Sequence, residues 1–147
     1  MSFRKFFSLL SGLVLAGVAG AQTLPLVELT AGIHRVEAEV VNTQQTRMIG
    51  LMHRRSMAPQ RGMLFVFDEV RTHCMWMKNT FIPLSVAFLD EGGRIINVED
   101  MQPHSEDNHC AARPARYALE MNLGWFRSRH LAPGTAIAGI ERAPPPR

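Results

Sequence analysis

The sequence predicts a single α+β domain whose sheet is mainly antiparallel and curls into a partial barrel, with one or two short helices. Three observations favour this class. Short segments alternate between apolar and polar residues, strong turn chemistry joins two of them at residues 90–93, and helical periodicity extends over only a few residues. Short strands with tight turns are expected to pair as hairpins.

The first half of the domain is expected to hold two strands, a helix and a further strand. Residues 36–41 alternate with the period of a strand that has one buried face, and residues 27–41 are expected to form two short strands. Asn42 or Thr43 is predicted to cap a helix that ends near Arg54, in which Gly50 lets a neighbouring group approach closely. The apolar face of this helix would hold Met48, Ile49, Leu51 and Met52. Residues 63–67 are an apolar run suited to a strand.

The second half is expected to be richer in strands. Residues 83–89 are apolar at both odd and even positions, so both faces of a strand here would be apolar. This predicts a central strand covered on both faces. The turn at 90–93 would join it to a strand over 94–101 as an antiparallel hairpin. We predict a long loop over 102–114, a strand over 117–121, a short helical turn capped by Asn122 and a last strand over 135–140.

An export signal is predicted at the start of the chain. Arg4 and Lys5 form a short positive region, residues 6–18 are mainly apolar, and residues 19–21 supply a small-x-small cleavage site. We therefore expect a cleavable signal peptide at 1–21, the single domain at 22–141 and a disordered, proline-rich tail at 142–147. The expected location is the periplasm or the medium outside the cell, with no transmembrane segment after cleavage.

Charge gives no reason to expect a nucleic-acid partner. The formal net charge of +3 at pH 7 falls by two, to +1, when residues 1–21 are removed, because they carry two basic residues and no acid. Between Glu39 and Asp68 the chain has four arginines and no acid. This asymmetry leaves open an anionic partner in the cell envelope, beside the alternative that the charges are solvated or hold two faces of the domain together.

The two cysteines, Cys74 and Cys110, are expected to form a disulfide. An exported chain matures in an oxidising compartment, and two cysteines allow one connectivity. Two buried free thiols and metal ligation are the alternatives.

Several motifs resemble those of one bacterial family. They are Arg47-x-x-Gly50-Leu51-Met52, Gly62-Met63-Leu64-Phe65, Trp76-Met77-Lys78-Asn79-Thr80-x-Ile82-Pro83-Leu84, Phe88-Leu89-Asp90, Gly93, Met101-x-Pro103 and Arg116-Tyr117-x-Leu119-Glu120. Together they make residues 36–140 resemble the family known as domain of unknown function 192. The resemblance implies a compact β-rich fold, frequent export or membrane anchoring, and no established substrate or cofactor. Two aromatic positions of the family are taken here by Cys74 and Cys110, and this paired departure further supports the disulfide.

Signatures of known catalytic and cofactor sites do not occur in the sequence. There is no nucleophile elbow, His-Glu-x-x-His, Cys-x-x-Cys, phosphate-binding loop or dinucleotide fingerprint, and no cofactor is predicted. Copper would suit a set of soft ligands in two stretches of the chain, which are His73, Cys74, Met75, Met77, Met101, His104, His109 and Cys110. Because strand alternation sends neighbouring side chains to opposite sides, no metal site is predicted, and copper binding is a third hypothesis.

Lys78 is the single lysine after residue 21, where the chain has thirteen arginines. A single lysine among so many arginines indicates that a compact ammonium is needed at this position, either to contact a ligand or to form a buried ion pair with Asp90 or Glu120. The alternative is that a lysine occurs here by chance. The leading hypothesis is a non-catalytic binding or accessory module of the cell envelope, with an unknown ligand in a groove around Arg47, Trp76, Lys78 and Asn79. The alternative is a small extracytoplasmic enzyme that uses Lys78 with the carboxylate of Asp90 or Glu120.

Overall fold

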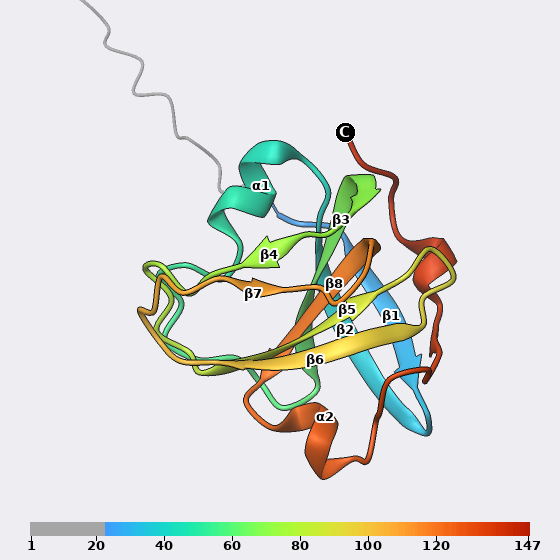
Figure 1. The fold of residues 1–147 in the computed structure, drawn as a ribbon. Coiled ribbons are helices and arrows are strands. Elements are labelled where there is room, and N and C mark those ends of the chain that lie inside the picture. Colours follow the sequence, from blue (N-terminus) through green and yellow to red (C-terminus); the bar gives the residue numbers. More distant parts are fainter. Residues whose placement is uncertain (1–22) are drawn as a thin grey trace, which may run out of the picture.

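The computed structural model describes residues 23–147, so the predicted signal peptide at 1–21 lies outside the described residues. The strands, in chain order, are β1 (Leu26–Ala31), β2 (His34–Val41), β3 (Arg61–Arg71), β4 (Cys74–Met75), β5 (Leu84–Leu89), β6 (Ile95–Met101), β7 (His109–Cys110), β8 (Ala115–Asn122) and β9 (Ile137–Ala138). The helices are α1 (Gln44–Ile49), α2 (Trp125–Ser128) and the 3₁₀ turn η1 (Ile140–Arg142) (Figure 1). None of the helices in this part of the chain is long and apolar enough to cross a membrane.

Seven of the strands form one curled sheet in the order β6-β5-β8-β3-β2-β1-β9, and β4 pairs with β7 in a separate ribbon. The prediction of a mainly antiparallel, mostly β domain is confirmed in outline, but the sheet is mixed, because β2 and β3 are parallel. Residues 42–60 connect these two strands and include α1, which gives the chain the length that a parallel crossover requires.

The two ends of the large sheet approach each other through the segment around β9. On one side β9 pairs with β1, and on the other side the Ile137 N–H donates to the Gly93 carbonyl at 2.8 Å. The Ile95 N–H donates to the Thr135 carbonyl at 2.9 Å, at the start of β6. These bonds hold the sheet in the half-barrel seen in Figure 1.

The core consists of two apolar clusters, which the alternation along β8 assigns to opposite faces of the sheet. Leu119 and Met121 belong to one cluster and Ala118 to the other. All six residues of β5 are buried, which confirms that this strand is covered on both faces, and it lies between β6 and β8 in the sheet. The connections between strands cover the second cluster, to which they contribute Leu51, Met77 and Ile82.

The helices are shorter than expected and have different caps. Thr43 caps α1 in a reciprocal pair with Thr46, and the helix ends at Ile49 rather than near Arg54, because Gly50 takes a left-handed φ of 49°. The predicted apolar face is only partly buried, since Leu51 packs into the core beyond the helix end while Met48 is 68% and Ile49 is 51% exposed. Gly50 does allow a close approach, by the ring of Phe65.

Asn42 and Asn122 bind other segments instead of capping helices. Asn42 Nδ2 donates to the Pro145 carbonyl at 2.6 Å, and the Arg147 N–H donates to the Asn42 carbonyl at 2.7 Å. The segment expected to be a disordered tail is therefore bonded to the end of β2. Asn122 Nδ2 donates to the Met57 carbonyl at 2.9 Å, and Gly124 takes the capping position of α2.

Candidate functional site

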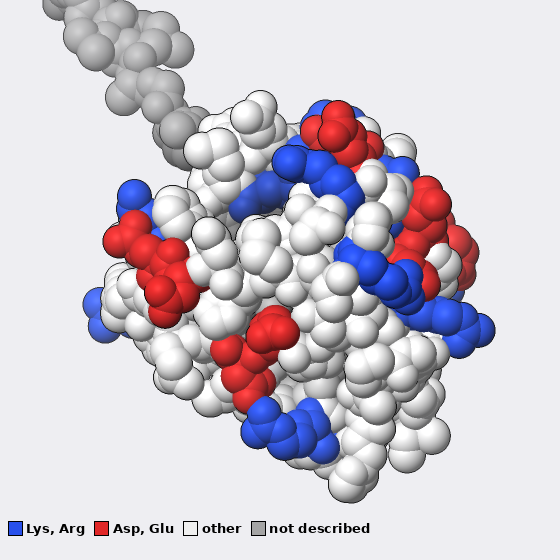
Figure 2. All heavy atoms as spheres, viewed as in Figure 1, with Lys and Arg blue, Asp and Glu red and all other residues white. Residues whose placement is uncertain are grey.

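A groove of about 870 Å³ lies between α1, β3 and the turn that follows β4. Leu51, Phe65 and Phe67 line it from the second apolar cluster, and Trp76 lines it from the turn. Figure 2 views this face and shows cationic and acidic side chains gathered beside α1 and the end of β3. The groove therefore combines apolar walls with charged groups.

The structure brings five of the six predicted site residues into this groove. They are Arg47, Trp76, Lys78, Asn79 and Glu120. Asp90 does not line it, because its carboxylate accepts from the N–H groups of Gly92 and Arg94, at 3.0 and 2.9 Å, and pairs with Arg113. Asp90 thus stabilises the β5–β6 turn, and its ion-pair partner is Arg113 and not Lys78.

Arg47 fixes α1 to β3. Its Nη1 donates to the Val66 carbonyl at 2.9 Å, and its Nη2 lies 2.5 Å from the Asp68 carboxylate. The side chain is only 13% exposed, so both partners hold the guanidinium within the groove wall. Its charge is already balanced by Asp68, which leaves it as a structural element of the site.

Lys78 lies at the mouth of the groove, where its Nζ is 5.2 Å from the centroid of the Trp76 ring. This is a cation–π distance, and Trp76 itself is 46% exposed. The turn is shaped by Asn79, which has a φ of 53° and whose carbonyl accepts from the His53 N–H at 2.9 Å. Within residues 23–147 Lys78 has no salt bridge, so the predicted ion pair with Glu120 is not formed.

Glu120 is the buried acid of the groove. It lies on β8 opposite Met63 of β3 and Val86 of β5, both in the second apolar cluster, and it is 3% exposed. Burial alone raises the pKa of its carboxyl from 4.5 to about 8, with no contribution from a charged or hydrogen-bonding group. The acid is therefore mostly protonated at neutral pH.

His73 is a wall residue that the sequence suggested only as a copper ligand. Its ring stacks on Phe67 with 3.7 Å between the ring centroids, and its Nε2 donates to the Glu69 carbonyl at 2.8 Å. Burial lowers the pKa of this imidazole, which favours the neutral form. No pattern in the sequence indicates such stacking.

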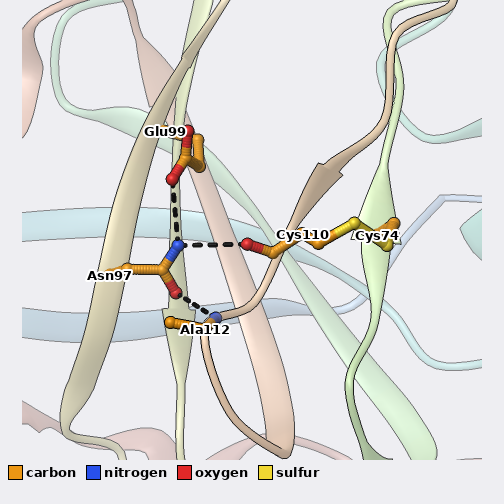
Figure 3. The surroundings of a disulfide bond; sticks show 5 residues. All are labelled: Cys74, Asn97, Glu99, Cys110 and Ala112. Carbon is orange, nitrogen blue, oxygen red and sulfur yellow. Dashed lines mark hydrogen bonds between the residues drawn. A yellow bond between two sulfur atoms is a disulfide. The ribbon is translucent and has the colours of Figure 1, made fainter.

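The predicted disulfide between Cys74 and Cys110 is present and joins β4 to β7 (Figure 3). Asn97 of β6 anchors the ribbon, because its Nδ2 donates to the Cys110 carbonyl at 3.1 Å and its Oδ1 accepts from the Ala112 N–H at 2.9 Å. Since Cys74 also lines the groove, the disulfide braces one wall of the site.

The side chains considered for copper do not form a complete ligand set, although Met75 and His109 are partners across the β4–β7 ribbon. The sulfur atoms of Cys74 and Cys110 are bonded to each other, which removes both thiolates, and Met77 is packed in the core at 1% exposure. Across residues 23–147, no three side chains among the histidines, cysteines and acids lie close enough to hold a metal ion.

The arginine-rich interval is largely neutralised by nearby acids. Arg54 pairs with Glu39 at 2.5 Å, Arg61 pairs with Glu37, and Arg47 pairs with Asp68. The acids come from before and after the interval, which is why the sequence alone suggests an unbalanced positive surface. These pairs hold α1 and β3 to their neighbours in the fold.

Comparison with known proteins gives a family and a fold. The model of the family DUF192, described as an uncharacterised ACR, matches residues 27–139. No curated protein matches the chain. A crystal structure of a protein from Sinorhizobium meliloti 1021, provisionally described as a transcription regulator, is 36% identical with a TM-score of 0.75, over 82% of this chain and 98% of that one. A protein of unknown function from Novosphingobium aromaticivorans DSM 12444 is 29% identical with a TM-score of 0.71, over 82% and 88%.

Proposed function

Because the chain belongs to the DUF192 family of uncharacterised proteins, we propose that it is a non-catalytic binding or accessory module of the cell envelope, with the groove as its ligand site. The observation that carries the proposal is the meeting of Trp76, Lys78 and Glu120 in one concave site with apolar walls. Ligand sites are commonly concave and mostly apolar, with a few polar groups that orient the ligand.

An extracytoplasmic location forms part of this proposal. The disulfide is compatible with an oxidising compartment, and the predicted signal peptide gives a route of export. Cells that express the full chain are expected to yield a product in the periplasmic or extracellular fraction whose intact mass lacks residues 1–21. A full-length product retained in the cytosol with two free thiols would contradict this location.

The architecture of the rim supports ligand binding. Trp76 presents an exposed aromatic face beside the ammonium of Lys78, on a turn that the Asn79 carbonyl bonds to His53. Such a pair offers both apolar contact and a positive charge to a bound molecule. The Lys78 ammonium forms no ion pair within residues 23–147, which leaves it available to contact a ligand at the mouth of the groove.

A binding experiment with matched variants tests the groove. The purified protein is incubated with the small-molecule fraction of a cell-envelope extract, and bound ligand is detected as a mass adduct by native mass spectrometry. Trp76→Ala is expected to lose the adduct. Phe81→Ala is expected to keep it, because Phe81 is a similarly exposed aromatic that does not line the groove. An adduct retained in Trp76→Ala, or absent from the wild type, argues against a ligand site here.

A second candidate function, an enzyme that uses Lys78 and Glu120, is favoured by one observation. Glu120 is a buried acid with a raised pKa in a concave site, which is a feature of general acids. Against it, Lys78 and Glu120 line the same groove without forming an ion pair. Turnover of an amide or ester substrate that is lost in both Lys78→Arg and Glu120→Gln would establish this function, and turnover that survives either variant would exclude the proposed pair.

A further inference from the structure

We infer that the groove takes a ligand that carries one positively charged nitrogen, a primary ammonium or a guanidinium, on an apolar body, and that this nitrogen binds the carboxylate of Glu120. The inference rests on the proposed binding function of the same groove and specifies the chemical class of the ligand.

Glu120 lacks a partner among residues 23–147. Buried polar groups are normally hydrogen-bonded, because an unpaired one loses its hydration without compensation. The carboxyl of Glu120 is 3% exposed and lines the groove, yet no charged or hydrogen-bonding group within residues 23–147 acts on it. Its free acceptor atoms are therefore available to a molecule that enters the groove.

The walls select what can approach this acid. Phe65 and Phe67 line the groove together with Trp76, and aromatic rings attract cations while they also pack against apolar groups. A ligand cation forms a charge-assisted bond with the carboxylate, which is stronger than a bond between neutral groups. An anion cannot replace the proton of this acid, and it would be repelled by the carboxylate once the acid ionises.

The remaining charged and titratable groups of the groove already have partners or lie at its mouth. They are Arg47, Asp68, Glu69, Arg71, His73 and Lys78. Arg47 is paired with Asp68, His73 donates to the Glu69 carbonyl, and Glu69 and Arg71 are 4.0 Å apart with largely exposed side chains. Lys78 lies on Trp76. None of them changes the pKa of Glu120, so the buried end of the groove carries one acid and no balancing cation.

Three probes with the same apolar body test this inference by isothermal titration calorimetry on the full chain. They are 2-phenylethylamine, 2-phenylethanol and 3-phenylpropanoate, which are cationic, neutral and anionic at neutral pH. Only the amine is expected to bind. Because the unliganded acid is mostly protonated, amine binding at pH 7 should release about 0.9 proton, measured in buffers of different ionisation enthalpy. The apparent affinity should rise about fiftyfold between pH 6 and pH 8, as the acid ionises.

Two variants locate the nitrogen. Glu120→Gln keeps the size and polarity of the side chain but cannot ionise, and it is expected to abolish proton release and the pH dependence. Glu69→Gln removes a carboxylate at the rim whose side chain is 78% exposed, and it is expected to behave like the wild type. Circular dichroism of both variants verifies that they are folded.

The outcomes separate this inference from the proposed function. If the alcohol or the acid binds as tightly as the amine and releases no proton, the groove is a binding site but the cation inference is wrong. The same holds if Glu69→Gln, rather than Glu120→Gln, abolishes proton release. If no probe binds the wild type, the inference is overturned, and the adduct experiment with Trp76→Ala decides the binding function independently.

Discussion

The buried carboxyl of Glu120 is expected to make the protein less stable as the pH rises from about 4.5 to about 8. The unfolded chain releases this proton near 4.5, whereas the folded protein retains it up to about 8. Between these values the folded state binds more protons, so each increase in pH favours the unfolded state. The contribution is fully present below the unfolded pKa and is lost as the pH passes the folded pKa.

The raised pKa of Glu120 sets the size of this effect. A change from 4.5 to about 8 corresponds to about 5 kcal/mol of unfolding free energy, of which about 3 kcal/mol is already lost at pH 7. Glu120→Gln removes the titration and keeps a neutral polar side chain of similar volume. The variant should match the wild type within about 1 kcal/mol at pH 5 and exceed it by several kcal/mol at pH 8.5.

Urea unfolding at intervals from pH 5 to pH 9, followed by circular dichroism, measures this difference. Subtracting the wild type from Glu120→Gln cancels other titrating groups, such as His73, whose lowered pKa makes stability rise with pH up to about 6.5. Glu69→Gln is the exposed control and should follow the wild type at every pH. Curves for the wild type and Glu120→Gln that stay parallel from pH 5 to pH 8.5 would refute the buried-acid argument.

Three further variants test the walls of the groove. Replacing both Cys74 and Cys110 by serine should lower the free energy of unfolding by about 4 kcal/mol, because the disulfide spans a sequence separation of 36 residues. Urea unfolding measures this loss, and an unchanged free energy of unfolding would contradict it. Gly50→Ala should lower the free energy of unfolding by about 1 kcal/mol or more, since the φ of Gly50 is 49° and a Cβ would lie 3.1 Å from the Phe65 ring. Thermal unfolding measures this loss, which should be smaller in the control Gly92→Ala. Arg47→Lys should lower the free energy of unfolding in urea by about 1 kcal/mol, because an ammonium cannot bridge the Val66 carbonyl and Asp68 as a guanidinium does. An equal loss in Arg55→Lys, at an exposed position, would contradict that role.

The longer strands could be predicted because they bury a regular pattern. Alternation identified β1 and β2, and the uniformly apolar run predicted the central position of β5. The ribbon of β4 and β7 has two residues in each strand, too few to show a period, and β7 falls within the predicted loop. The disulfide was nevertheless predictable, because it depends on the compartment and the cysteine count rather than on periodicity.

The parallel pairing of β2 and β3 could not be deduced from local patterns. Each strand shows the same apolar pattern whether its neighbour runs parallel or antiparallel, and direction is set by where the connection crosses. Here residues 42–60 carry the chain back across the sheet, and Arg47 then fastens α1 to Val66 and Asp68 on β3. Those contacts are between residues about twenty positions apart, which single-sequence patterns do not encode.

For the candidate site, too, the sequence indicated which residues take part but not how they are arranged. The sequence suggested Lys78 and Glu120 as site residues, and it offered an ion pair of Lys78 with Asp90 or Glu120 as one alternative to a ligand contact. Among residues 23–147 Lys78 forms no such pair. A second signal was present on β8, where Leu119 and Met121 flank Glu120 and are both apolar, so that the acid must face away from them. The other face of β8 is covered by the second apolar cluster, and a carboxyl there loses its hydration. The chemistry of the groove is therefore governed by whether Glu120 holds its proton, and a ligand that takes the place of that proton must bring a positive charge.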